Sequence, residues 1–142
     1  MAHTTTSIDI AATPAQVWQR IGGFNSLPDW LPYIPSSTLS DGGRIRHLAN
    51  PAGDVIVEQL EAYDNTARCY SYSILQAPFP ATDYLSTLHV SAIAGSEHAR
   101  VTWSGRFTPV GVSEQEVTDL FHAIYVAGLE ALQQSLAQSS AT

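Results

Sequence analysis

The chain has 142 residues, of which 44% are hydrophobic and 13% charged, with six arginines, no lysine, 13 acidic residues and a net charge of −7. This length fits one domain over residues 1–142, with an ordered core over about residues 4–137. A chain this acidic lacks the clustered basic residues that bind nucleic acid or anionic lipid, so we expect neither as a partner.

The N-terminal quarter predicts one strand and two short helices. Isoleucines alternate with polar residues over residues 4–11, which is typical of a half-buried strand. Residues 13–16 have the spacing of a capping box with proline at the first helical position, and this helix ends at the glycine pair 22–23. Residues 24–35 are apolar and rich in proline, which indicates a second short helix or a turn.

The middle of the chain predicts strands, and the end predicts one long helix. The strand-like runs cover residues 43–48, 55–63, 68–75, 84–94 and 99–108. Their short connections favour antiparallel hairpins. A second capping box at residues 113–116 opens a helix with an apolar stripe that extends to about residue 137. Its length would be roughly 37 Å at about 1.5 Å per residue.

This order of elements predicts an α+β fold. A curved antiparallel sheet of about six or seven strands would wrap around the C-terminal helix, with the two short helices placed after the first strand. One helix cannot fill the concave face of so large a sheet. We therefore expect a cavity between sheet and helix, closed at one end by the proline-rich segment.

Several segments occur together in a recognisable order and spacing. They are residues 8–12, 14–18, 24–32, 43–46, 58–60, 63–64, 70–72, 78–80 with Tyr84, and 101–107. Spread over about residues 4–137, they resemble the START/Bet v 1-like superfamily (SRPBCC), and within it the bacterial polyketide cyclase/dehydrase-like proteins. The resemblance implies a helix-grip fold. It leaves the function open, because the superfamily holds ligand carriers, cyclases and protein-binding members on one scaffold.

Glu58 is the main candidate for chemistry. It lies in an otherwise apolar strand, and the next strand would bring Tyr70 and Tyr72 close to it. A carboxylate beside phenols in an apolar cavity has a raised pKa, which suits a ligand anchor or a general acid or base. The structural alternatives are a glutamate on the solvent face of the sheet and one paired with Arg46.

Arg46 and a set of aromatic residues complete the predicted binding site. Arg46 lies closest to the Glu58 hairpin and could anchor an acidic ligand, the alternative being an ordinary surface arginine. Alternation turns Trp103 and Phe107 inward, and Gly105 between them would leave space beneath the helix. The aromatic residues predicted to line the pocket, or simply to form the core, are Trp30, Tyr33, Tyr70, Tyr72, Tyr84, Trp103, Phe107, Phe121 and Tyr125.

The remaining motifs argue against other classes of site. His122 neighbours the apolar stripe of the long helix and could reach the pocket mouth, with a structural role at its rim as the alternative. No histidine or cysteine spacing typical of a metal site occurs, and Cys69 is the single cysteine, so we expect no metal and no cofactor. Without a signal peptide or an apolar run long enough to span a membrane, we expect a cytoplasmic protein.

Three functions follow from these residues and from the resemblance. The leading prediction is a small-molecule binding protein that holds a hydrophobic or aromatic ligand, lipid or polyketide-like, oriented by Arg46, Glu58 and Tyr72. The resemblance also implies a polyketide cyclase/aromatase or dehydratase-like enzyme that uses Glu58, Tyr72 or His122 as acid or base. The third is a protein-interaction module similar to co-chaperones. The base rate among soluble proteins allows a homodimer.

Overall fold

The computed structural model describes residues 2–31 and 33–140, and residues 138–140 by their backbone alone. Pro32 of the proline-rich segment therefore lies outside the described residues. The elements are β1 (Ala2–Ile10), α1 (Pro14–Ile21), α2 (Leu27–Trp30), β2 (Ser36–Ser40), a 3-10 turn (Asp41–Gly43), β3 (Ile45–Ala49), β4 (Val55–Asp64), β5 (Cys69–Gln76), β6 (Ala81–Ala92), β7 (Ala99–Pro109) and α3 (Glu114–Ser140).

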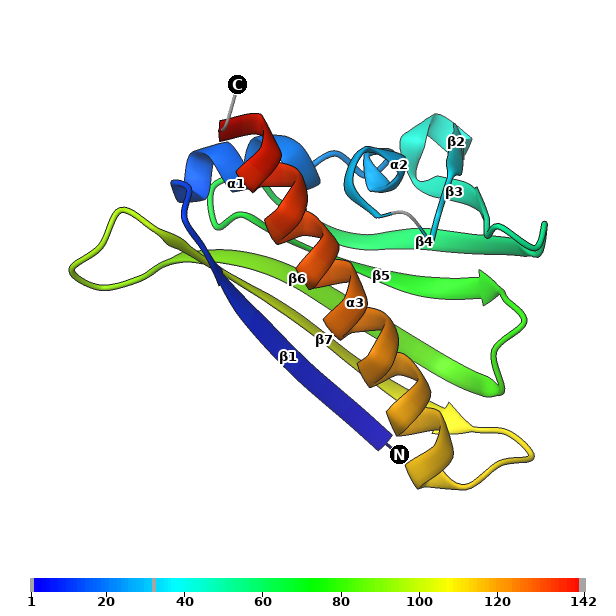
Figure 1. Cartoon of the computed structure of the whole chain (residues 1–142). Helices are drawn as coiled ribbons and strands as arrows, with labels where there is room; N and C mark the ends of the chain where they lie inside the picture. Colours follow the sequence, from blue (N-terminus) through cyan, green and yellow to red (C-terminus); the bar gives the residue numbers. More distant parts are fainter. Residues whose placement is uncertain (1, 32, 141–142) are drawn as a thin grey trace.

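Seven antiparallel strands form one sheet in the order β1-β7-β6-β5-β4-β3-β2. Helix α3 crosses the concave face of this sheet, and α1 and α2 lie together beyond one end of the strands (Figure 1). The predicted helix-grip fold is confirmed. No helix in the described part of the chain is long and apolar enough to cross a membrane.

Local sequence signals set the helix ends. At α1 the Thr13 hydroxyl accepts the Gln16 N–H at 3.2 Å, and the Gln16 side chain accepts the Thr13 N–H at 2.9 Å. This reciprocal pair satisfies two backbone donors that would otherwise lack partners. At the start of α3 the Ser113 hydroxyl accepts the Glu116 N–H at 3.1 Å. Both predicted helix starts are therefore correct.

The region before β3 differs from the sequence prediction. Asp41, Gly42 and Gly43 have φ angles of 53°, 68° and 89°, which form a turn, so β3 begins at Ile45 rather than at residue 43. The strand before this turn, β2, is polar and largely exposed. As an edge strand with no buried face it lacks the apolar alternation by which a strand is predicted.

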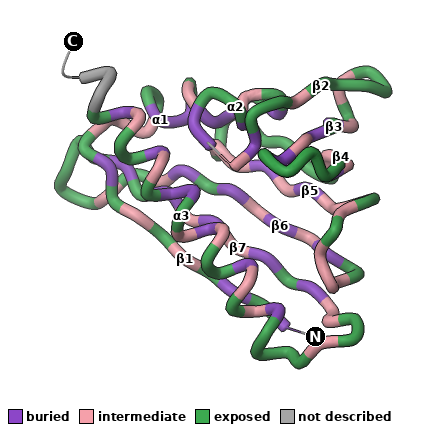
Figure 2. The backbone as a smooth tube through the Cα atoms, turned by 45° about the vertical axis from the view of Figure 1, so that its right-hand side comes forward, coloured by how far each residue is buried: buried purple, intermediate pink, exposed green. Residues whose placement is uncertain are grey.

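The core lies between α3 and the concave face of the sheet. Buried residues recur along the inner strands and along the helix surface that faces them (Figure 2). In β7 the buried positions alternate from Ala99 through Val101, Trp103, Gly105 and Phe107. This period of two is the geometric property of a strand with one face covered.

Candidate functional site

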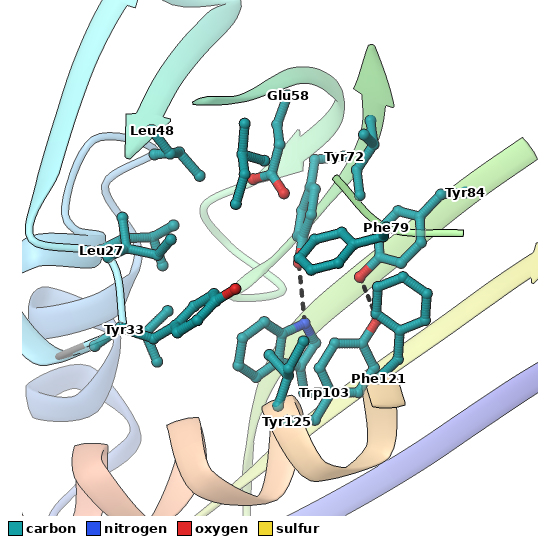
Figure 3. Close-up of a pocket in the computed structure, with 15 residues that line it drawn as sticks. Leu27, Tyr33, Leu48, Glu58, Tyr72, Phe79, Tyr84, Trp103, Phe121 and Tyr125 are labelled. Atoms are coloured by element: carbon teal, nitrogen blue, oxygen red, sulfur yellow. Dashed lines mark hydrogen bonds between the residues drawn. The ribbon is translucent and has the colours of Figure 1, made fainter. Parts of the chain in front are cut away.

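A small cavity lies between the concave face of the sheet, α3 and the segment that contains α2. Its volume is about 40 Å³, which is room for roughly one to three water molecules. The expected cavity is thus present in position but mostly filled. Aromatic side chains from the sheet and from α3 meet around it (Figure 3).

Gly105 explains why so little space remains. The sequence predicts that this glycine leaves a void beneath the helix, but the Tyr125 side chain of α3 occupies that space. A Cβ atom at position 105 would overlap the Tyr125 hydroxyl. The Tyr125 ring also stacks on Trp103 with 4.5 Å between centroids. The glycine therefore accommodates a phenol and does not leave a cavity for a ligand.

Seven of the predicted site residues line the cavity. They are Tyr33, Glu58, Tyr72, Tyr84, Trp103, Phe121 and Tyr125. The rest of the wall is formed by residues that the sequence reasoning did not select, and these come mainly from the proline-rich segment, β3, β4, β5 and the β5–β6 connection. Among them are Leu31, Ile34 and Phe79. For Phe79, its position between two prolines was the sequence signal that could have indicated a place in the cavity wall.

The other predicted site residues lie outside the wall. Trp30 is buried behind Trp103, with 5.9 Å between ring centroids. Its Nε1 is, among the described side chains, the one buried nitrogen or oxygen atom without a hydrogen-bond partner. Phe107 is buried beneath Phe121, with 4.7 Å between ring centroids.

His122 is exposed and points away from the cavity. Its Nδ1 lies 2.9 Å from the Thr4 hydroxyl of β1. One residue along a helix turns the side chain by about 100°, so the position after the buried Phe121 faces the edge of the sheet. His122 therefore does not reach a molecule in the cavity.

Glu58 presents a carboxylate to the cavity and is held by Arg46. Nε of Arg46 donates to Oε1 of Glu58 at 2.8 Å, and Nη2 of Arg46 forms an ion pair with the same oxygen at 2.7 Å. The Arg46 Nη1 donates to the Phe24 carbonyl at 2.9 Å. The second carboxylate oxygen, Oε2, takes part in none of these bonds, and Glu58 lines the cavity wall.

Aromatic rings enclose the Arg46 guanidinium. Its central carbon lies 4.2 Å from the Phe24 ring centroid, 4.7 Å from that of Tyr72 and 5.8 Å from that of Tyr70. Tyr70 is buried on this side, behind the cavity wall. Arg46 is 1% exposed, so the alternative of a surface arginine is wrong. Its position also shows that it fixes Glu58 and does not itself line the cavity.

The charges of this pair are coupled. Burial raises the pKa of the Glu58 carboxyl, and the Arg46 charge opposes that rise. Burial also disfavours the charged guanidinium, but the Glu58 carboxylate beside it raises the pKa of Arg46. The guanidinium therefore stays protonated. A buried guanidinium needs a carboxylate partner, which ties Glu58 to its position.

A network of buried hydroxyls forms the floor of the cavity. The Trp103 indole N–H donates to the Ser86 hydroxyl at 2.9 Å and to the Tyr72 hydroxyl at 3.2 Å. The Tyr125 hydroxyl donates to the Ser86 hydroxyl at 3.3 Å and is also hydrogen-bonded to the hydroxyl of Tyr84. The sequence reasoning missed Ser86, although it occupies the same inward face of β6 as Tyr84.

Burial keeps these phenols protonated. It raises the pKa of Tyr72 and of Tyr84 well above the ordinary value, and it raises the pKa of Tyr125 to about 12. The site therefore combines one carboxylate with neutral hydroxyl donors in an apolar wall. Within the described ranges, no group of three His, Cys, Asp or Glu side chains could hold a metal ion.

Comparison with known proteins agrees with this architecture. A solved structure of the protein XoxI from Bacillus cereus is 62% identical, covers 95% of each chain and superimposes with a TM-score of 0.93. A protein from Bacillus thuringiensis is 59% identical over 94% of this chain and 98% of its own, also with a TM-score of 0.93. A START superfamily protein from Mycobacterium smegmatis shares the fold at 14% identity, over 97% of this chain and 99% of its own, with a TM-score of 0.80.

No curated protein matches the sequence. The family model described as "Polyketide cyclase / dehydrase and lipid transport" matches residues 1–137, nearly the whole chain. Together with the helix-grip architecture, this match confirms the family that the sequence resembles. The chain belongs to the polyketide cyclase/dehydrase and lipid transport family.

Proposed function

We propose that this protein binds an apolar or aromatic small molecule that carries an oxygen substituent, in the cavity between sheet and α3. The observation that carries the proposal is the buried carboxylate of Glu58 in a wall that is otherwise mostly apolar. Arg46 holds its Oε1, whereas Oε2 takes no part in the contacts with Arg46. Few polar groups in an apolar pocket are typical of small-molecule sites.

Glu58 and Tyr72 define the polar part of recognition. Oε2 of Glu58 can accept a hydrogen bond from a hydroxyl or N–H of the ligand. The Tyr72 hydroxyl accepts the Trp103 indole N–H through a lone pair, so its own proton can be donated. A ligand with a hydroxyl group close to a carbonyl satisfies both, and the apolar wall contributes roughly 25 cal/mol for each Å² of apolar ligand surface buried.

The size of the cavity adds a requirement. Its volume of about 40 Å³ is smaller than the roughly 150 Å³ of an apolar cavity that binds benzene. Binding therefore requires at least one wall side chain to move. We expect water in the cavity when no ligand is bound.

The same residues support an enzyme of the cyclase or dehydratase kind as a second candidate. Burial raises the pKa of Glu58, which makes its carboxylate a better base, and burial keeps Tyr72 protonated. Tyr72 would polarise a carbonyl while Glu58 removes a neighbouring proton. His122 lies outside this arrangement, so acid–base chemistry would depend on Glu58 and Tyr72.

Native mass spectrometry of the purified protein, followed by extraction and analysis of any bound molecule, tests the proposal. We expect an aromatic or apolar passenger, and we expect the neutral probe N-phenyl-1-naphthylamine to compete with it. A protein that carries no passenger and does not bind the probe would overturn the small-molecule functions and favour the protein-interaction alternative.

Variants then separate binding from catalysis. Glu58→Gln should retain the passenger and abolish turnover if the protein is an enzyme, whereas in a carrier no turnover is lost. Glu61→Gln is the matched control, because Glu61 lies on the same strand but is exposed. Tyr72→Phe, which keeps the ring and removes the hydroxyl, provides a second variant if Glu58→Gln destabilises the protein.

A further inference from the structure

Phe79 lines both the small cavity and a second, larger hollow. This outer hollow has a volume of about 250 Å³ and lies where β5 ends and β6 begins. Phe79, Ile74, Tyr84 and Phe121 line both spaces. Ile74, Tyr84 and Phe121 belong to β5, β6 and α3, whereas Phe79 lies on the connection between the two strands.

The backbone of this connection is held in place, while the Phe79 side chain is less constrained. Prolines on both sides of Phe79 restrict its backbone. The Val110 N–H donates to the Pro80 carbonyl at 2.9 Å, and the Ala81 N–H donates to the Phe79 carbonyl at 2.9 Å. The Phe79 ring is half-buried and packs edge-on against Phe121, with 5.2 Å between centroids. Rotation of the side chain alone can therefore move the ring.

The two spaces differ in chemistry. The inner one holds Glu58 and Tyr72 in a mostly apolar wall. The outer one includes the exposed side chains of Gln76 and Thr82. Figure 3 shows Phe79 beside Tyr84 and Phe121 at the opposite end of the cavity from Tyr33. A molecule that passes Phe79 would thus have one end among apolar residues and the other beside polar groups and solvent.

We infer that Phe79 determines the length of the ligand that this site accepts, and that the ligand is an elongated molecule with an apolar or aromatic head at Glu58 and Tyr72 and a polar tail at Gln76 and Thr82. Displacement of the ring joins the inner cavity, the volume of the ring itself and the outer hollow. The joined space approaches the range of about 300–1,000 Å³ that is typical of ligand pockets. This inference rests on the proposed function, because it assumes binding in the inner cavity.

Two naphthol probes test the inference. The short probe is 2-naphthol, and the long probe is 6-(6-hydroxyhexyl)-2-naphthol, which has the same head and a tail that ends in a hydroxyl. Naphthol fluorescence gives the Kd of each for the wild type, Phe79→Ala, Phe79→Trp and the control Val110→Ala, which is exposed and lines neither space. Thermal melting establishes that each variant is folded.

We expect Phe79→Ala to increase the preference for the long probe over the short one by roughly tenfold, since binding no longer displaces an aromatic ring. Phe79→Trp should decrease that preference, and Val110→Ala should leave it unchanged. An unchanged preference in both Phe79 variants, with probe binding retained, would overturn the inference and leave the proposed function intact. If neither probe binds to any variant or to the wild type, the proposed function fails and the inference fails with it.

Discussion

Two ion pairs with nearly the same local geometry lie near opposite edges of the sheet. Arg46 of β3 faces Glu58 of β4, and Arg100 of β7 faces Asp9 of β1, each pair directly across neighbouring antiparallel strands. The shortest nitrogen–oxygen distances are 2.7 and 2.8 Å. The side chains of the first pair are 1% and 9% exposed, whereas those of the second are 49% and 55% exposed.

The difference comes from the face of the sheet on which each pair lies. Arg46 shares the inward face of β3 with Leu48, while Asp9 lies between two inward isoleucines on β1 and points outward. Water and dissolved salt screen the exposed pair, whose contribution is accordingly small. The buried pair has lost its hydration, so each partner depends on the other. Four predictions test this contrast between buried and exposed polar groups, from the largest expected effect to the smallest.

Arg46→Met should cause the largest loss of stability. It leaves the Glu58 carboxylate buried without its partner, and removing one member of a buried pair typically costs about 3–5 kcal/mol. Urea unfolding at neutral pH measures the change. Arg44→Met is the matched control, because Arg44 is exposed two residues earlier. Equal effects of the two substitutions would show that burial does not distinguish these arginines.

The double variant Arg46→Met/Glu58→Leu should recover most of that loss. Replacement of a whole buried ion pair by apolar residues of similar volume is often neutral, or stabilising by about 1–4 kcal/mol. The same unfolding measurement applies, with Glu58→Leu alone completing the cycle. Additive effects of the two single substitutions would contradict the interdependence. Recovered stability together with lost probe binding would show that the pair is retained for recognition.

Alkaline pH should destabilise the buried region. Unfolded tyrosines have a pKa of about 10, whereas burial raises the pKa of Tyr125 to about 12 and those of Tyr72 and Tyr84 well above the ordinary value. Above pH 10 the unfolded chain therefore binds fewer protons than the folded one, and stability falls as pH rises.

The stabilisation from these phenols is complete below about pH 10 and is lost as pH rises through the folded-state values. Urea unfolding at pH 8, 9, 10 and 11 measures it. Tyr125→Phe should show a shallower decline over the same range, because one titrating phenol is absent. A stability that stays constant up to pH 11 would contradict the prediction.

Asp9→Asn should have the smallest effect. The hydrogen bond from Arg100 lowers the pKa of Asp9 in the folded protein. The pair therefore contributes its full stability above the pKa that Asp9 has in the unfolded chain, and this contribution is lost as pH falls through the pKa of Asp9 in the folded protein. Both side chains are about half exposed, which makes the contribution small and sensitive to salt. We expect nearly unchanged unfolding by urea in high salt. A loss comparable to that of Arg46→Met would contradict the comparison between the two pairs.

Most of the helices and strands could be predicted from local sequence signals. The capping residues Thr13 and Ser113, the alternation of β7 and the apolar stripe of α3 each depend on the geometry of a few neighbouring residues. Strand β2 could not be predicted in this way, since it has no buried face. The proximity of Glu58, Tyr72 and Arg46 followed from the hairpin order of their strands.

The sequence by itself thus determined most of the elements and their order, because backbone geometry repeats every two or 3.6 residues. It left open whether Glu58 faces the cavity or the solvent, since a shift of one residue in strand register reverses the facing. Tertiary structure alone decided that Arg46 is enclosed by aromatic rings, that Tyr125 fills the space above Gly105, that His122 faces the sheet edge and that Phe79 lines two neighbouring hollows. These outcomes depend on how α3 is rotated against the sheet and on which side chains compete for one space. Close packing settles that competition only when all the elements are assembled.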